Sequence, residues 1–122
     1  MQSQKKWTLL LIQDNESEFN MNTDVFEHFF TKVDKTVGRE DALKRYENGS
    51  YDIVLSDLSV HPEELGFLKQ IKDINEKQCI FAFVAPQDEN KLYSIADLGI
   101  NAFMLTPDQL EAALEAIADF DP

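Results

Sequence analysis

The stretch Tyr51-Asp52-Ile53-Val54-Leu55-Ser56-Asp57-Leu58 decides the fold. Its apolar run has no polar alternation, which is typical of a strand buried on both faces of a parallel sheet. Two similar runs, a weaker candidate at residues 32–37 and a further strand after Gly99 bring the expected strands to five. They are residues 7–12, 32–37, 53–55, 80–84 and 102–105.

Segments with helical periodicity separate these strands. Four apolar stripes predict amphipathic helices. They are Phe19, Val25, Phe26, Phe29 and Phe30; Leu65, Phe67, Leu68, Ile71 and Ile74; Leu92, Ile95, Ala96 and Gly99; and Leu110, Ala113, Leu114 and Ile117. A fifth, shorter helix is expected around residues 39–48, with Gly49 ending it. Alternating strands and helices predict a parallel α/β sheet with right-handed crossovers and helices on both faces.

Polar residues follow the strands at the edge where ligands of such sheets gather. Asp14 follows the first strand and Asp57 ends the third, so the two carboxylates are expected to converge. At about 4 Å they would repel by roughly 4 kcal/mol at an effective dielectric of 20, which favours a bound divalent cation such as magnesium. The alternative is that the two acids merely cap adjacent turns.

The composition favours one domain, residues 1–122, with residues 1–6 as a disordered tail. The net charge of −12 would repel nucleic acid and anionic membranes. The lone cysteine, Cys79, cannot form an intramolecular disulfide, and no segment approaches the length of a membrane span. We therefore expect a cytoplasmic protein that binds neither nucleic acid nor membrane. The abrupt end after a helix suggests a domain excised from a longer chain, and a free-standing protein is the alternative.

From Trp7 to about Phe120 the chain resembles the receiver domains of response regulators in two-component systems, of the chemotaxis-regulator type. Leu10-Leu11-Ile12-Gln13-Asp14-Asn15 and Tyr51-Asp52-Ile53-Val54-Leu55-Ser56-Asp57-Leu58 carry the resemblance. It implies a three-layer, flavodoxin-like fold with strand order 2-1-3-4-5 and five helices. It also implies that Asp57 accepts phosphate, and that Asp14, Asp57 and the backbone carbonyl of Ser59 hold magnesium.

The sequence departs from the family pattern at several positions. Gln13 replaces an acid, which predicts weak magnesium binding, and Val84 replaces the hydroxyl that bonds the phosphoryl group. Thr106 replaces a lysine, although Thr106-Pro107-Asp108-Gln109 also reads as a helix-capping box. Phe103 stands at the aromatic switch position, where half-buried packing is the plainer interpretation. We therefore expect a degenerate site.

Two roles remain open at this point. The first is a phosphorelay receiver phosphorylated on Asp57, and the second is a phosphorylation-independent module that acts by binding alone. The resemblance implies a sensor histidine kinase or another signalling protein as partner. It also implies a homodimer through the fourth helix, fifth strand and fifth helix, a face expected to carry Tyr93, Ile95, Phe103, Leu114 and several acids. Enzyme readings, flavodoxin-like or phosphatase, are disfavoured because residues 13–18 are acidic and the first strand lacks an Asp-x-Asp pair.

The loop after the third strand also departs from the pattern. Val60-His61-Pro62 precedes a glycine, Gly66, that comes one residue late. His61 could ligate a metal or donate to a phosphoryl oxygen, but a loop histidine is more often simply solvated.

Overall fold

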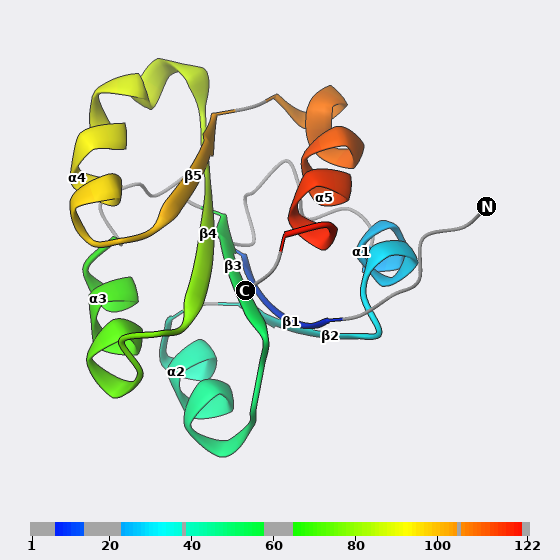
Figure 1. Cartoon of the computed structure of the whole chain (residues 1–122), viewed down its shortest axis with the longest axis vertical. Coiled ribbons are helices and arrows are strands. Elements are labelled where there is room, and N and C mark those ends of the chain that lie inside the picture. The colour runs from blue at the N-terminus through cyan, green and yellow to red at the C-terminus, as the bar shows by residue number, and fades with distance from the viewer. Residues whose placement is uncertain (1–6, 14–22, 38, 58–64, 105, 121–122) are drawn as a thin grey trace.

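The computed structural model describes residues 7–13, 23–37, 39–57, 65–104 and 106–120. Within them lies one five-stranded sheet in which all strands are parallel, in the order β2-β1-β3-β4-β5 (Figure 1). The strands are β1 Thr8–Gln13, β2 Lys32–Val37, β3 Ile53–Asp57, β4 Cys79–Val84 and β5 Asn101–Met104. The predicted order and parallel sense are confirmed.

Helices cover both faces of the sheet, which makes three layers. They are α1 Thr23–Phe29, α2 Arg39–Asn48, α3 Leu65–Ile74, α4 Leu92–Asp97 and α5 Leu110–Ala118, with the 3-10 helices η2 Pro86–Lys91 and η3 Pro107–Gln109 before α4 and α5. One core joins the sheet to α1 and α5, and a second joins it to α2, α3 and α4 (Figure 1). The predicted three-layer architecture is therefore confirmed.

The central strands explain why their sequences lack polar alternation. All five residues of β3 are buried, and Leu9, Leu10 and Leu11 of β1 have no exposed surface. Odd-numbered residues of these strands enter the α1–α5 core and even-numbered residues enter the opposite core. Because each buried aliphatic side chain contributes roughly 1.5–3 kcal/mol, both faces of these strands stabilise the fold.

The weakest predicted strand, residues 32–37, forms with those bounds at the β2 edge of the sheet. It pairs with β1 from Thr8↔Lys32 to Gln13↔Val37. As expected for an edge strand, its ends are exposed and three of its four interior residues are only partly buried. Its buried Thr36 hydroxyl donates to the carbonyl oxygen of Leu11 at 3.3 Å, which satisfies that polar group inside the core.

Two glycines end helices in different ways. Gly99 follows α4 with a φ of 75°, the left-handed conformation expected at this position. Its N–H donates to the Ala96 carbonyl at 2.9 Å, and the next N–H, of Ile100, donates to the Ile95 carbonyl at 3.3 Å. These two bonds form a Schellman motif.

Gly49 directly follows α2, as predicted, and its φ is not positive, so this helix does not end in a left-handed glycine. A Cβ atom there would lie 3.0 Å from the Tyr51 ring and 3.1 Å from the Arg45 carbonyl oxygen. A close approach of these groups therefore accounts for the glycine.

Several predicted boundaries shift by one or two residues. The first strand begins at Thr8 and extends to Gln13, and the third extends to Asp57, so both reach the edge of the sheet. Ile74 ends α3 with 54% of its surface exposed, which corrects its assignment to the buried stripe. Phe19 and the predicted tail, residues 1–6, lie outside the described residues. No described helix is long and apolar enough to span a membrane.

Candidate functional site

The carboxyl ends of the parallel strands meet at one edge of the sheet. β1 ends at Gln13, β3 at Asp57 and β4 at Val84, and Thr106 lies two residues beyond the end of β5. The sheet order makes β1, β3 and β4 consecutive neighbours. The fold therefore brings these predicted site residues to the same edge.

Asp57 is the most central acid of this edge. It lies on the middle strand with 7% of its surface exposed, and it pairs in register with Phe83 of β4. On the other side, β1 and β3 pair as far as Ile12↔Ser56, so the next step of the register places Gln13 beside Asp57. Gln13 is itself 3% exposed. A carboxylate and a neutral amide thus stand on adjacent strands, roughly 4.8 Å apart.

The two faces of the sheet divide the edge residues. By strand alternation Gln13 and Asp57 follow the direction of Leu11 and Leu55, toward the α1–α5 side. Val84 instead belongs to the opposite core and has no exposed surface. Its side chain is therefore a packing group that offers no hydrogen-bond donor.

Thr106 is engaged in local helix-start contacts. Its N–H donates to the Gln109 side-chain oxygen at 2.9 Å, which is one of the two bonds of the predicted capping box. Its hydroxyl donates to the Asp108 carboxylate. The Gln109 N–H donates to the Thr106 carbonyl at 2.9 Å rather than to its hydroxyl, because the chain first makes the 3-10 turn η3 before α5. The local capping role predicted for Thr106 is thus confirmed in part.

Phe103 is half-buried against the α1–α5 core, as predicted. Its ring centre lies 5.7 Å from that of Phe81, with the planes tilted by 36°. Phe81 also meets Phe120 edge-on at 5.2 Å. The Phe103 ring therefore packs against the α1–α5 core, and its distance from Phe81 is within the range of favourable ring contacts.

Comparison with solved structures shows which proteins share this fold. The chain matches the chemotaxis response regulator CheY4 of Vibrio cholerae with a TM-score of 0.71 at 16% identity, covering 90% of this chain and 97% of that one. It matches the BeF3-activated DrrB receiver domain with a TM-score of 0.70 at 13% identity, covering 93% and 98%.

This chain has the fold of response regulator receiver domains. A receiver domain protein from Clostridium thermocellum gives a TM-score of 0.65 at 18% identity, covering 92% of this chain and 94% of that one. The same fold occurs in a structure of adenylate cyclase from Rhodopirellula baltica, with a TM-score of 0.69 at 16% identity and coverage of 89% and 84%. No protein-family model matches the chain, and no curated protein matches it significantly in sequence.

Part of the predicted receiver site lies outside the described residues. Asp14, Ser59 and His61 are among these, so the convergence of Asp14 with Asp57 and the magnesium ligand set stay predictions. Within the described ranges, no group of three His, Cys, Asp or Glu residues could hold a metal ion. Asp57 is thus the one predicted metal-ligating residue that the structure describes.

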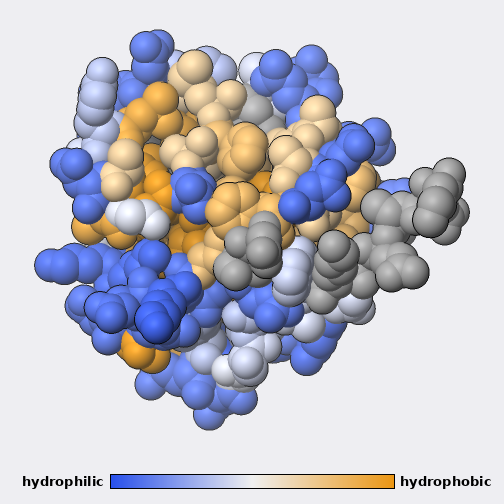
Figure 2. All heavy atoms as spheres, in the orientation of Figure 1, coloured by the Kyte–Doolittle hydropathy of each residue, from blue (hydrophilic) through white to orange (hydrophobic). Residues whose placement is uncertain are grey.

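The predicted docking face of the receiver fold needs a correction. Ile95 and Leu114 are 1% and 0% exposed, because their helices turn these side chains into the two cores. Tyr93 and Met104, at 83% and 44%, are the large exposed apolar residues of α4 and β5. Figure 2 shows apolar side chains gathered over α4, β5 and α5, whereas hydrophilic side chains cover the region of α2.

The opposite, amino-terminal edge holds a polar network that sequence patterns did not reveal. The Thr8 N–H and hydroxyl both lie within hydrogen-bond range of the Asp52 carboxylate, at 3.0 and 3.1 Å. The buried Gln78 side chain accepts from the Tyr46 hydroxyl at 2.8 Å and donates to the Asp52 carbonyl at 3.2 Å. The sequence does show polar residues near the starts of the strands. Their hydrogen-bond partners lie 26–44 positions away along the chain, so the sequence pattern could not identify the pairs.

Proposed function

We propose that this chain is a receiver domain in two-component phosphorelay signalling and that Asp57 accepts a phosphoryl group at a weakened site. The observation that carries the proposal is the position of Asp57 at the carboxyl end of the central strand of a receiver fold. In the proposed reaction a carboxylate oxygen of Asp57 attacks the phosphorus of a donor, whose leaving group departs, and an acyl phosphate forms. The domain accepts phosphate but is not itself an enzyme in this proposal.

The oxygen ligands expected at this edge suit magnesium, and we expect the site to bind it with reduced affinity. Carboxylate, amide and carbonyl oxygens suit magnesium, and Asp14, Asp57 and the Ser59 carbonyl would hold it. The bound ion would offset the charge of the phosphoryl group during transfer. Because Gln13 is buried next to Asp57 as a neutral amide, the site has one negative charge fewer than the family pattern.

The same edge supports the alternative of a pseudo-receiver that signals without phosphorylation. Val84 is packed in the core and the Thr106 hydroxyl already donates to Asp108. Neither side chain is therefore placed to donate a hydrogen bond to a phosphoryl group. Phosphorylation changes conformation when new oxygens find partners. The protein would then act as an interaction module.

We propose a sensor histidine kinase or another signalling protein as partner, in the cytoplasm. The exposed Tyr93 and Met104 support a homodimer through α4, β5 and α5, since exposed apolar residues there would gain from burial. The net charge of −12 supports the proposal that the domain binds neither nucleic acid nor anionic membranes.

Incubation with acetyl phosphate and magnesium tests the phosphorelay proposal. Intact mass spectrometry is expected to show one added phosphoryl group that alkali removes, and Asp57→Asn should abolish it. The matched variant Asp52→Asn, on the opposite edge, should keep it. Absence of any adduct on the folded wild-type protein, together with an adduct on a Val84→Thr/Thr106→Lys variant, would establish the pseudo-receiver instead.

A further inference from the structure

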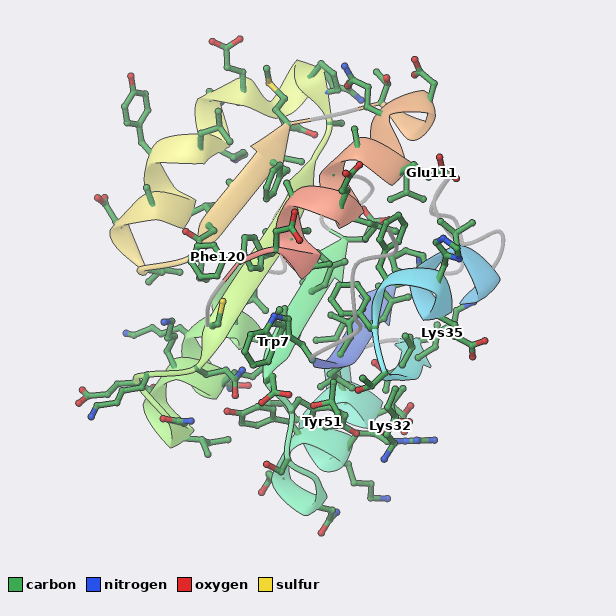
Figure 3. The ribbon with its side chains drawn as sticks, turned by 45° about the vertical axis from the view of Figure 1, so that its right-hand side comes forward. Trp7, Lys32, Lys35, Tyr51, Glu111 and Phe120 are labelled. Carbon is green, nitrogen blue, oxygen red and sulfur yellow. The ribbon has the colours of Figure 1, made fainter. Side chains whose placement is uncertain are left out.

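A charged groove lies at the amino-terminal edge of the sheet, on the end opposite Asp57. It has a volume of about 310 Å³ and runs between α2, the first half of β2 and the segment that joins α2 to β3. Its lining is Lys32, Asp34, Asp41, Lys44, Arg45, Asn48, Gly49 and Tyr51. Figure 3 shows Lys32 and Tyr51 close together at this end of the molecule, next to α2.

The groove belongs to the part of the chain with a positive balance. Residues 32–48 contain five of the eleven cations and four of the 23 acids, a net charge of +1. The remaining residues therefore carry −13. The acidic remainder of the molecule would repel an acidic partner, whereas residues 32–48 would not. Electrostatics would therefore orient such a partner toward β2 and α2.

The cations of the groove differ in how they are paired. Lys32 forms an ion pair with Asp34 at 3.5 Å, and the Tyr51 hydroxyl donates to the same carboxylate at 2.5 Å. Lys44 and Arg45 are exposed and form no ion pair with any residue in the described ranges. Asp34 is thus already satisfied, while two cations remain available to an incoming anion.

We propose that this groove is a docking site for an acidic segment of a partner protein. Five of its eight lining residues are charged, whereas small-molecule pockets are mostly apolar with a few polar groups. A protein segment also fits the setting, because β2 is an edge strand whose outer backbone groups can pair with an added strand. Carboxylates of that segment would then meet Lys44 and Arg45, and Arg45 can bind a carboxylate in a bidentate manner.

This docking site is independent of phosphate chemistry at the other edge. The proposal would hold for a phosphorelay receiver and for a pseudo-receiver. Its failure would leave the proposed role of Asp57 untouched, because the acetyl phosphate assay measures that role separately.

Titration of the ¹⁵N-labelled protein with an unstructured glutamate-rich peptide, followed by NMR, tests the docking site. Chemical-shift changes are expected in β2 and α2, and the charge-reversed variant Lys44→Glu/Arg45→Glu should bind roughly tenfold more weakly or worse. Lys69→Glu/Lys77→Glu is the matched control, since it makes the same change in net charge on exposed lysines outside the groove. This control should retain binding in β2 and α2.

Three outcomes would overturn the proposal. They are no shift changes at all, equal weakening in both charge-reversed variants, and stronger binding of inorganic phosphate than of the peptide at the same residues. The second would reduce the effect to overall charge, and the third would identify a small-anion site. Circular dichroism of both variants establishes that they are folded before the titrations are compared.

Discussion

Replacing Gln13 with aspartate should make the stability of the domain depend on magnesium. The register places residue 13 beside Asp57, on strands roughly 4.8 Å apart, and both positions are buried. Two carboxylates separated by about this strand spacing would repel by about 3.5 kcal/mol at an effective dielectric of about 20. For a domain of this size that loss lowers the melting temperature by roughly 10 °C.

Thermal unfolding with and without magnesium measures this effect. A cation that binds the folded Gln13→Asp variant at about 100 times its Kd restores about 2.7 kcal/mol, so most of the lost stability should return. The wild type should change little with magnesium, because the amide of Gln13 adds no charge. Gln13→Asn is the matched control, having the shape of aspartate without its charge.

The reasoning fails if Gln13→Asp melts like Gln13→Asn in a chelator and magnesium shifts neither. That result would mean that residue 13 and Asp57 do not share an environment. A large magnesium shift in the wild type would instead refute the inference that the site has a reduced cation affinity. The first result would test the register of β1 and β3, and the second would test the effect of the missing charge at residue 13.

Three further predictions concern the frame around the site. Gly99→Ala should destabilise the protein by about 1–2 kcal/mol in urea unfolding, because alanine is strained at positive φ. Gly66→Ala is the control: a Cβ atom there would have no neighbouring atom within 4 Å, so this change should be neutral or stabilising. Tyr46→Phe should cost about 1–3 kcal/mol by leaving the buried oxygen of Gln78 without its donor, and the same unfolding measurement checks it. Burial and a bond to a carboxylate raise the pKa of Tyr51 to about 12, so its stabilising contribution should be complete below pH 10 and fall as the pH rises toward 12, as pH-dependent unfolding of wild type and Tyr51→Phe would show.

Periodicity was sufficient for the fold because both faces of this sheet are covered. Runs such as Leu9–Leu10–Leu11 are apolar on every residue only when helices bury both sides, which is what the structure shows. Strand order, by contrast, came from the family resemblance, because periodicity does not encode which strands are neighbours. The exposed end of α3 was missed since Ile74 fits the apolar stripe although the helix stops there.

The candidate site was predictable in position more than in detail. Parallel topology alone sends Gln13, Asp57 and Val84 to one edge. Only the side-chain directions in the structure show that Val84 faces the core opposite Asp57. They also show that the Thr106 hydroxyl is bonded to Asp108. The amino-terminal network escaped prediction for the same reason, because its hydrogen bonds join residues from separate strands and helices.

The full burial of Val84 suggests a physical reason why the fold can persist without a phosphorylation switch. A hydroxyl at a position with no exposed surface needs a partner, or it costs about 1–3 kcal/mol. In a receiver that switches, as the family resemblance implies, the phosphoryl group supplies that partner, and the difference in bonding between the two states can bias the conformation. Valine has no hydroxyl to satisfy, so in the proposed pseudo-receiver it would also remove this difference in bonding between the two states. In the proposed pseudo-receiver, the valine would therefore stabilise the resting fold and uncouple it from Asp57, and recognition would depend on surfaces such as the proposed groove between α2 and β2.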